Sequence, residues 1–346
     1  MSKGRIRRRK GGGGKQVEDA HRDRVVLGAD WMTGLPERYR DVPLCCLAIP
    51  GSHNSCSVYR DEESNVDQRS DPIYRQYVDH MGELANKISH RWTVTQSLSI
   101  TEQLDAGVRY LDIRVTARQG DREDLNVYFR NGPNIIIILK EIRRWMDLHP
   151  KEVILLDFRV VHKMSQAHHR YLLANMTDDV FRGRLLECTG VVQAVTLRNM
   201  SAIDAQIIVF YPKECEQQHT CVWPNEYIGY LHPQAQSTRD MIDRLNTRYQ
   251  HGRPPHVFFS WDGVLTTTNE YLANNLHSTL RDSLSRPATR ALCNWVRNKD
   301  IRHGDMNIVV ADFVETSSFV DEVIRVNYEL RELRKYDFES CVCNIL

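Results

Sequence analysis

The residues of this sequence that could perform chemistry stand at or just after the ends of short apolar runs. Seven such positions carry a histidine, an arginine, an amide, aromatic residues and carboxylates, in this order: His53, Arg114, Asn131, Asp157, Tyr211, Trp261 with Asp262, and Asp312. A histidine exchanges protons near neutral pH, although a single turn histidine bonded to backbone is the common alternative. Seven polar strand ends in succession predict a polar pocket, because the carboxyl ends of parallel barrel strands converge on one face.

The apolar runs themselves predict parallel strands, because they are continuous and rich in Val, Ile and Leu. They span 44–49, 108–115, 125–129, 153–158, 207–211, 257–261 and 307–313. Amphipathic stretches at 135–148, 168–186, 239–249, 276–298 and 318–334 predict helices, and Ser99 with Glu102 forms a capping-box start for a short one. This alternation predicts an α/β fold, either a TIM-like distorted barrel or an open sheet. No glycine-rich phosphate loop follows a strand, which argues against a nucleotide-binding open sheet.

The composition of the 346 residues is that of a globular protein, with 41% hydrophobic and 26% charged residues. The net charge of +1 gives no strong field toward nucleic acid. There is no apolar run long enough to span a membrane and no secretory signal pattern. Nine scattered cysteines predict reduced thiols in the cytoplasm, and the adjacent pair Cys45 and Cys46 lacks zinc-ligand spacing.

The two ends of the chain differ from the middle. Residues 1–24 are basic and glycine-rich and are expected to be disordered, either as a solvated tail or as a nuclear or anionic-lipid targeting segment. Residues 336–346 form a C-terminal tail whose last four residues fit a prenylation pattern at Cys343, and Cys341 could carry a second lipid. The alternative for this tail is a frayed end that carries no lipid.

An ordered series of motifs resembles one known family. Residues 49–55 place His53 in a tight turn, and the run from Trp92 to Val115 closely resembles the X domain of phosphatidylinositol-specific phospholipases C. The similarity is greatest to small intracellular proteins that consist of an X domain alone. Further counterparts lie at 127–132, 149–158, 209–211, 223–224, 258–261 and 307–314. The resemblance implies one X domain, assigned to residues 25–335.

The resemblance also implies a mechanism. This family cleaves a phosphodiester through attack of the inositol 2-hydroxyl on phosphorus, with diacylglycerol as the leaving group. His53 stands at the position of the base and Asp312 at that of the carboxylate that orients it. Arg114 takes the position of the phosphate clamp, where calcium-dependent members have acidic residues. The resemblance therefore implies an enzyme without metal or other cofactor.

The sequence departs from the family pattern at the catalytic acid. Asn131 replaces the second histidine, and Asn54 replaces the aspartate that supports it in bacterial-like members. An amide does not protonate an alkoxide at neutral pH, and loss of a positioned acid costs about 10²–10⁴ in rate. The neighbouring Arg130 holds its proton too tightly to be a good acid, but it could stabilise charge.

Five residues are candidates for contacts with the inositol headgroup: Asp157, Arg159, Tyr211, Trp261 and Arg130. For the two aromatic residues, packing in the pocket wall or the core is the alternative interpretation.

Two functional hypotheses follow. The first is a phosphoric diester hydrolase that acts on inositol phospholipid at a membrane surface. The second is a pseudoenzyme that binds such a headgroup without turnover, which Asn54 and Asn131 favour. A metal-dependent glycerophosphodiester phosphodiesterase is more remote, since the sequence 112–114 is not a Glu-x-Asp pair. The expected location is the cytoplasm, with peripheral membrane attachment through the C-terminal tail.

Overall fold

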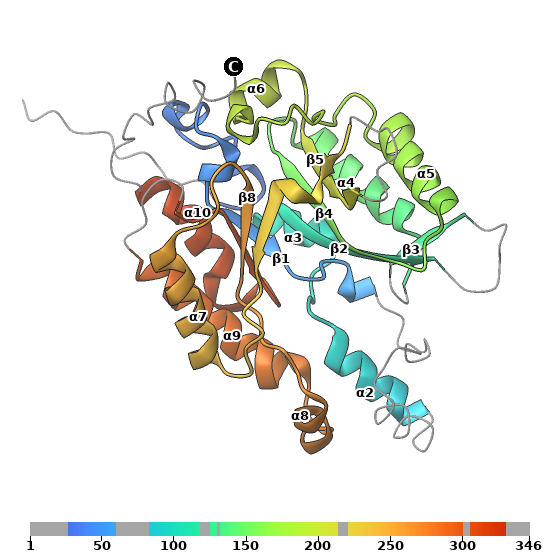
Figure 1. Ribbon diagram of the computed structural model, residues 1–346, viewed down its shortest axis with the longest axis vertical. Helices are drawn as coiled ribbons and strands as arrows, with labels where there is room; N and C mark the ends of the chain where they lie inside the picture. Colours follow the sequence, from blue (N-terminus) through green and yellow to red (C-terminus); the bar gives the residue numbers. More distant parts are fainter. Residues whose placement is uncertain are drawn as a thin grey trace, which may run out of the picture.

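The computed structural model shows eight parallel strands that curl into a half-barrel with helices around it (Figure 1). It describes residues 27–59, 83–117, 125–129, 132–213, 221–299 and 305–329. The strand order in this part of the chain is β6-β5-β4-β2-β1-β9-β8-β7. The strands are β1 (Ile49–Ser52), β2 (Tyr110–Ala117), β4 (Ile154–His162), β5 (Ile207–Tyr211), β6 (Trp223–Pro224), β7 (Ile228–Leu231), β8 (Phe258–Asp262) and β9 (Ile308–Ala311). The TIM-like distorted barrel expected from the sequence is confirmed.

The two edges of the half-barrel are joined by a single segment. β6 pairs with β5, and β7 pairs with β8, while the short turn η8 (Asn225–Tyr227) connects β6 to β7. One strand lies off this path: β3 (Val127–Phe129) pairs antiparallel with the end of β2. The predicted strand at 125–129 is therefore a hairpin arm beside the barrel and not one of its parallel strands.

Helices cover the outer surface of the half-barrel in two groups. In Figure 1, α7, α9 and α10 lie along one side of the strands, and α4 and α5 lie along the other. The helices are α2 (Glu83–Thr93), α3 (Ile100–Ala106), α4 (Ile135–Leu148), α5 (Gln166–Ala174), α6 (Leu197–Ala202), α7 (Thr238–His251), α8 (Asn269–Asn274), α9 (Arg286–Arg297) and α10 (Phe319–Glu329). Shorter turns are η1 (Gly28–Asp30), η2 (Glu37–Tyr39), η3 (Leu44–Cys46), η4 (Ser57–Tyr59), η5 (Asn175–Val180), η6 (Val192–Ala194), η9 (Arg281–Ser285) and η10 (Thr316–Ser318).

Helix α3 begins as the sequence predicts, whereas two other predicted elements have different bounds in the structure. The capping box of Ser99 and Glu102 is present, and α3 ends at Gly107 with a φ of 112°, which suits glycine. The strand predicted at 44–49 was placed too early, since 44–46 form the turn η3, closed by a 2.7 Å bond from Cys46 N to the Pro43 carbonyl. The long helix predicted at 168–186 ends at Ala174 and gives way to the π turn η5.

The amino ends of β2 and β4 are held by one buried ion pair, which we call the amino-end cluster: Arg109 and Glu152. The Arg109 Nη2 lies 2.8 Å from Glu152 Oε2, and both side chains are fully buried. The other carboxylate oxygen of Glu152 accepts bonds of 2.7 Å from the backbone N and hydroxyl of Thr33. Trp31 donates from its indole to the Gly107 carbonyl at 2.9 Å. The segment near residue 30 is therefore fastened to this end of the barrel.

The described residues form one large apolar core and one small cluster. The small cluster packs Ile88 and Trp92 of α2 against Leu280 and Leu284, with side chains of α8 around it. In Figure 1, α2 and α8 project together beyond the strands. Within the described part of the chain, no helix is long and apolar enough to cross a membrane. The predicted tails 1–24 and 336–346 lie outside the described residues.

Candidate active site

His53 lies immediately after β1, in a turn that backbone and side-chain bonds hold firmly. Its backbone N donates to the Ala311 carbonyl of β9 at 3.0 Å. Its own carbonyl accepts from Gln96 Nε2 and from Thr95 Oγ1, each at 3.0 Å. Gln96 Nε2 also donates to the Ala311 carbonyl at 3.0 Å, so one side chain bridges the ends of β1 and β9. The position of the imidazole is thus set by two adjacent strands.

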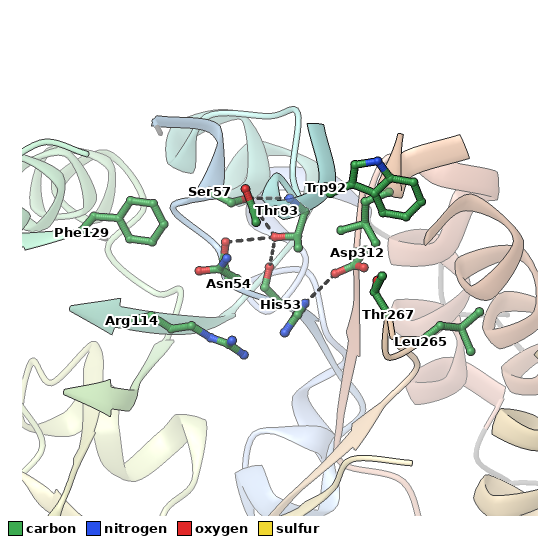
Figure 2. Close-up of a pocket in the computed structure, with 12 residues that line it drawn as sticks. His53, Asn54, Ser57, Trp92, Thr93, Arg114, Phe129, Leu265, Thr267 and Asp312 are labelled. Atoms are coloured by element: carbon green, nitrogen blue, oxygen red, sulfur yellow. Dashed lines mark hydrogen bonds and ion pairs between the residues drawn. The ribbon is translucent and has the colours of Figure 1, made fainter. Parts of the chain in front are cut away.

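The imidazole of His53 is paired with Asp312, as Figure 2 shows. The His53 Nδ1 lies 2.7 Å from Asp312 Oδ1, and the other oxygen of Asp312 accepts a 2.6 Å bond from the Ser285 hydroxyl. Thr289 in α9 donates to the Asp312 carbonyl at 2.7 Å. A carboxylate fixed in this way selects the tautomer with the proton on Nδ1. Nε2 then carries the lone pair that can accept a proton.

His53 and Asp312 open onto a cavity of about 220 Å³. Arg114 and Asn54 also line it, together with hydroxyl-bearing and apolar side chains (Figure 2). The apolar lining comes from four residues: Trp92, Phe129, Leu265 and Leu280. The structure therefore brings together the proposed base, its carboxylate and the proposed phosphate clamp at the carboxyl ends of the strands, beside an apolar wall.

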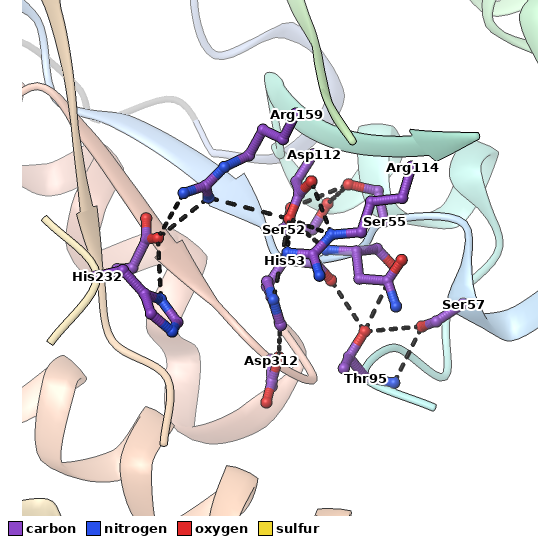
Figure 3. A network of polar contacts seen from close by, with 12 residues as sticks. Ser52, His53, Ser55, Ser57, Thr95, Asp112, Arg114, Arg159, His232 and Asp312 are labelled. Carbon is purple, nitrogen blue, oxygen red and sulfur yellow. Dashed lines mark hydrogen bonds and ion pairs between the residues drawn. The ribbon is translucent and has the colours of Figure 1, made fainter. Parts of the chain in front are cut away.

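A chain of charged side chains continues from His53 into the barrel, which we call the carboxyl-end cluster: Asp112, Arg114, Arg159 and Asp262. Figure 3 shows the first three of them beside His53. His53 Nε2 lies 3.9 Å from Asp112 Oδ2, which accepts a 2.8 Å bond from Arg114 Nη2. Arg159 Nη1 lies 4.0 Å from the same Asp112 oxygen and 3.0 Å from Asp262 Oδ2. Asp112 therefore contacts both guanidiniums, and Asp262 pairs with Arg159 alone.

The electrostatics of this cluster favour ionised carboxylates. Burial raises the pKa of Asp112, but the charges of Arg114 and Arg159 outweigh burial, so this pKa lies well below its usual range. Burial likewise raises the pKa of Asp262, and Arg159 with His232 lowers it below the usual value. The side chains of Arg114 and Arg159 keep 28% and 14% exposure, while both carboxylates have none. The two guanidiniums are thus closer to solvent than the carboxylates, and Arg114 lines the cavity.

Asn54 adopts a left-handed backbone conformation with a φ of 44°, which asparagine tolerates better than most residues. Its backbone N donates to Asp112 Oδ2 at 3.0 Å, whereas its side-chain Oδ1 is buried and has no hydrogen-bond partner in the described part of the chain. This unpaired oxygen is buried beside the cavity that Asn54 lines. The other two residues of the predicted acid region, Asn131 and Arg130, lie outside the described residues.

Asp157 lies deeper, where it joins β4 to β2 and β7. Its Oδ2 accepts from the Tyr110 hydroxyl at 2.5 Å and from the Tyr230 hydroxyl at 2.9 Å. Burial raises the pKa of this carboxyl to about 7. The guanidinium of Arg159 lies over the Tyr230 ring, with 4.2 Å from Cζ to the ring centroid. Asp157 therefore holds Tyr230, whose ring lies against Arg159, and its own side chain is nearly inaccessible.

The structure places two predicted headgroup residues away from the cavity. Tyr211 is fully buried, and its hydroxyl lies 2.8 Å from His169 Nδ1 on α5. Trp261 is fully buried among Phe259, Tyr249 and Trp295. Both rings fill space between the sheet and its helices, which was the packing alternative for these aromatic residues.

Two residues near the carboxyl-end cluster were not singled out from the sequence. Tyr230 belongs to β7, which was not predicted as a strand, and His232 follows that strand. His232 Nδ1 lies 3.4 Å from Asp262 Oδ2, and its side chain is 38% exposed. His232 fits the pattern seen at the other strands, a polar residue just after the strand end. That pattern could not reveal it, because β7 has only four residues and is too short to be recognised as a strand from the sequence. Among the described residues, no three His, Cys, Asp or Glu side chains converge as metal ligands.

Fold and site together define a phospholipase C-like α/β barrel protein. The PI-PLC X 1 family model matches residues 85–320, so the chain belongs to the PI-PLC X family. It is 33% identical to PI-PLC X domain-containing protein 3 of Homo sapiens over 308 residues, covering 88% of this chain and 95% of that protein. It is 32% identical to PI-PLC X domain-containing protein 1 of Homo sapiens, covering 87% and 93%.

Solved structures resemble the barrel at low sequence identity. The phosphatidylinositol-specific phospholipase C from Listeria monocytogenes matches with a TM-score of 0.56 and 18% identity, covering 89% of this chain and all of that one. A mutant of the enzyme from Staphylococcus aureus matches with a TM-score of 0.60 and 12% identity, covering 88% and 98%. These likenesses establish the fold.

Proposed function

We propose that this protein is a phosphoric diester hydrolase that cleaves inositol phospholipid without a metal ion. The observation that carries the proposal is the His53–Asp312 pair, which shares one cavity with Arg114. His53 Nε2 takes the proton of the inositol 2-hydroxyl while that oxygen attacks phosphorus, and Asp312 stabilises the imidazolium that forms. Arg114 binds the phosphate oxygens with the N–H groups that do not bond to Asp112.

The headgroup contacts of the proposal come from the carboxyl-end cluster. Arg159 is partly exposed and held by Asp262, so its guanidinium is fixed and can donate to inositol hydroxyls. Tyr230 beside it is 37% exposed and presents a ring face. Asp157 serves as the support of both residues. Tyr211 and Trp261 have no role in this scheme, because neither side chain is exposed.

A second candidate function, headgroup binding without turnover, is favoured by one specific observation. Among the described cavity residues, no histidine other than His53 and no carboxyl group other than Asp312 is available as an acid. Asn54 offers an unpaired amide oxygen in that region, which binds a hydroxyl but supplies no proton to an alkoxide. The two candidates share the same ligand and differ only in proton donation.

A turnover assay separates these candidates. Vesicles of phosphatidylinositol in phosphatidylcholine are incubated with the protein, with and without a chelator, and the released inositol phosphates are measured. Hydrolysis that a chelator leaves unchanged and His53→Gln abolishes supports the hydrolase. If hydrolysis requires calcium, the metal-free mechanism is wrong. If vesicles bind through Arg114 but no inositol phosphate appears, the protein is the pseudoenzyme.

Restoring the missing acid tests whether the lack of proton donation limits turnover. We expect Asn131→His with Asn54→Asp to raise turnover of natural lipid by about 10²–10⁴, the usual contribution of a general acid. An aryl phosphodiester of inositol should gain far less, because an aryl alcohol leaves without a proton. Each single change should give less than the pair. Equal gains on both substrates would show that the pair serves binding or folding.

The membrane part of the proposal is peripheral attachment of a cytoplasmic protein through a lipid on Cys343, with Cys341 as a second site. One lipid chain binds a membrane weakly, so two signals are needed for stable attachment. Cys343→Ser is expected to release the protein from membrane fractions, with Cys188→Ser as the control. Unchanged membrane recovery together with an unmodified C-terminal peptide in the mass spectrum would refute the anchor.

A further inference from the structure

Two adjacent cysteines lie at the opposite end of β1 from His53. Cys45 and Cys46 belong to the turn η3, and their Sγ atoms are 4.0 Å apart. The Cys45 residue is 3% exposed and Cys46 is 9% exposed. Asn307 Nδ2 donates to the carbonyls of Leu44 and Leu47, at 3.0 and 2.9 Å, and so fixes the turn from both sides. The two sulfur atoms are therefore held together before any chemistry occurs.

An arginine is directed at one of the two sulfur atoms. Arg253 Nη2 lies 3.8 Å from Cys46 Sγ and donates to the Cys45 carbonyl at 2.7 Å, while Nη1 donates to the Val257 carbonyl at 2.9 Å. The hydrogen bond with Cys45 lowers the pKa of the Cys46 thiol, and the charge of Arg253 lowers it further. The same hydrogen bond raises the pKa of Cys45. Arg253 thus favours the thiolate form at Cys46, the sulfur that it contacts.

This environment selects among the chemistries open to two thiols. A metal ion needs more ligands than two sulfur atoms, and the fixed charge of Arg253 repels a cation while it stabilises a thiolate. A thiolate stabilised by a guanidinium beside a second thiol is instead the arrangement of an oxidisable pair, in which one sulfur reacts and the other resolves.

We propose that Cys45 and Cys46 are a reversible oxidation site that reacts with hydrogen peroxide, with Cys46 as the attacking thiolate and Cys45 as the resolving thiol. The Cys46 thiolate attacks one peroxide oxygen, the O–O bond breaks, and the departing hydroxide takes a proton to become water. The Cys45 sulfur then attacks the sulfenic acid, the S–O bond breaks, and hydroxide leaves with the Cys45 proton as a second water. In total, two thiols and one peroxide give one disulfide and two waters.

The product of this reaction is easily reduced, which makes the modification reversible. Adjacent Cα atoms are about 3.8 Å apart across a trans peptide, whereas disulfides usually join Cα atoms separated by about 4.4–6.8 Å. A disulfide between neighbours is therefore strained and more oxidising than a structural one. Closing the ring also turns the peptide between the two cysteines, whose carbonyl accepts a hydrogen bond from Arg253, so oxidation should lower the thermal midpoint of the protein.

Peroxide oxidation of the full chain tests the proposal. Reduced protein at pH 7 is treated with hydrogen peroxide and digested, and the peptide with both cysteines is followed by mass spectrometry. We expect it to lose two hydrogens at least tenfold faster than Cys293, the comparison thiol, is oxidised, and dithiothreitol should restore it. Oxidation of this peptide no faster than that of Cys293, or oxidation only to sulfinic acid, would overturn the proposal.

Variants assign the two roles. In Cys45→Ser, whose hydroxyl can still donate a hydrogen bond to Cys46, dimedone should trap a sulfenic acid on Cys46, formed at about the rate at which the wild type reacts with peroxide. In Cys46→Ser the remaining thiol should react at least tenfold more slowly. Arg253→Gln should slow the first step at pH 7, while Arg253→Lys, which keeps the charge, should retain most of the rate. Near-ultraviolet circular dichroism checks that each variant is folded. Equal trapping on Cys45 and Cys46 would contradict the assignment.

Discussion

Arginine–carboxylate pairs lie at both ends of β2 and β4, and the two ends use them differently. In the amino-end cluster, all five N–H groups of Arg109 are occupied: by Glu152 through Nε and Nη2, by the carbonyls of Leu104 and Val108 through Nη1, and by the Ala29 carbonyl through Nη2. In the carboxyl-end cluster, Arg114 bonds only to Asp112 among the described residues, and its Nη1 donates to none of them.

The two ends therefore differ in the donors that their arginines leave free within the described part of the chain: none at the amino end and at least Nη1 of Arg114 at the carboxyl end. A guanidinium whose donors are all satisfied by its own protein has nothing left for a substrate, so Arg109 contributes only to folding. Arg114 keeps both exposure and unused donors at the face where barrel active sites lie. Free donors, more than charge, distinguish the end of these strands where we propose that the ligand binds.

The largest effect expected is on stability at the amino-end cluster. Glu152→Gln leaves the buried Arg109 without a counter-charge, and breaking such a pair costs about 3–5 kcal/mol of the free energy of unfolding. Arg244→Ala, which removes an exposed pair with Asp240 on α7, should cost only about 0.3–0.5 kcal/mol. Chemical denaturation of both variants measures this. A loss below 1 kcal/mol for Glu152→Gln would contradict the claim that the amino-end cluster stabilises the fold.

The next largest effect is on turnover at the carboxyl-end cluster. Arg114→Met removes the donors that stabilise charge on the phosphate, which should lower kcat by about 10²–10³. Arg114→Lys keeps a positive charge beside Asp112 and should preserve stability while recovering only part of the rate, because the planar fork is lost. Steady-state kinetics and denaturation are measured on the same samples. Full activity in Arg114→Met would show that another group binds the phosphate.

The third effect is a pH dependence of the free energy of unfolding, caused by Asp157. Burial raises the pKa of Asp157 to about 7, whereas an unfolded aspartate titrates near 3.9. Between these values the folded state binds more protons, so its free energy of unfolding falls as pH rises, by up to ~1.4 kcal/mol per pH unit. Asp112 and Asp262, with lowered pKa values, act only at lower pH. Asp157→Asn should flatten this slope, and an unchanged slope would contradict the assignment.

The smallest effect concerns Tyr230, which links β7 to β4. Tyr230→Phe removes the 2.9 Å bond to Asp157 but keeps the ring under Arg159, so it should cost about 0.5–1.5 kcal/mol. The lost bond had lowered the pKa of Asp157, so the pH dependence of stability should move to higher pH. Tyr230→Leu loses the ring as well and should cost more. Equal losses for the two variants would mean that the stacking contributes nothing.

The sequence predicted the barrel and the meeting of His53, Arg114 and Asp312, because parallel strands bring their carboxyl ends together whatever their order. The sequence could not show which of two adjacent residues at a strand end has its side chain directed into the barrel. At the end of β8, Asp262 binds Arg159 while the preceding Trp261 packs against α9, since successive side chains alternate between faces.

Two other features could not be predicted from the sequence, one because the strand is short and the other because the paired residues are far apart in the chain. β7 has four residues and follows a turn directly, so no periodic pattern develops, and Tyr230 with His232 was missed with it. The partnership of Arg109 and Glu152 joins residues 43 positions apart and depends on the register between β2 and β4. Neither spacing nor composition shows such a contact.

Ligand-induced stabilisation tests the central claim, that the carboxyl-end cluster receives the headgroup while the amino-end cluster holds the fold. Glycerophosphoinositol, a soluble inositol phosphodiester, is added with a chelator at about 100 times its Kd, and the free energy of unfolding is measured. The wild type should gain about 2.7 kcal/mol. Glu152→Gln should gain the same from a lower starting value, and Arg114→Met, with a Kd at least tenfold weaker, should gain about 1.4 kcal/mol or less. Equal gains in the wild type and Arg114→Met would contradict the claim.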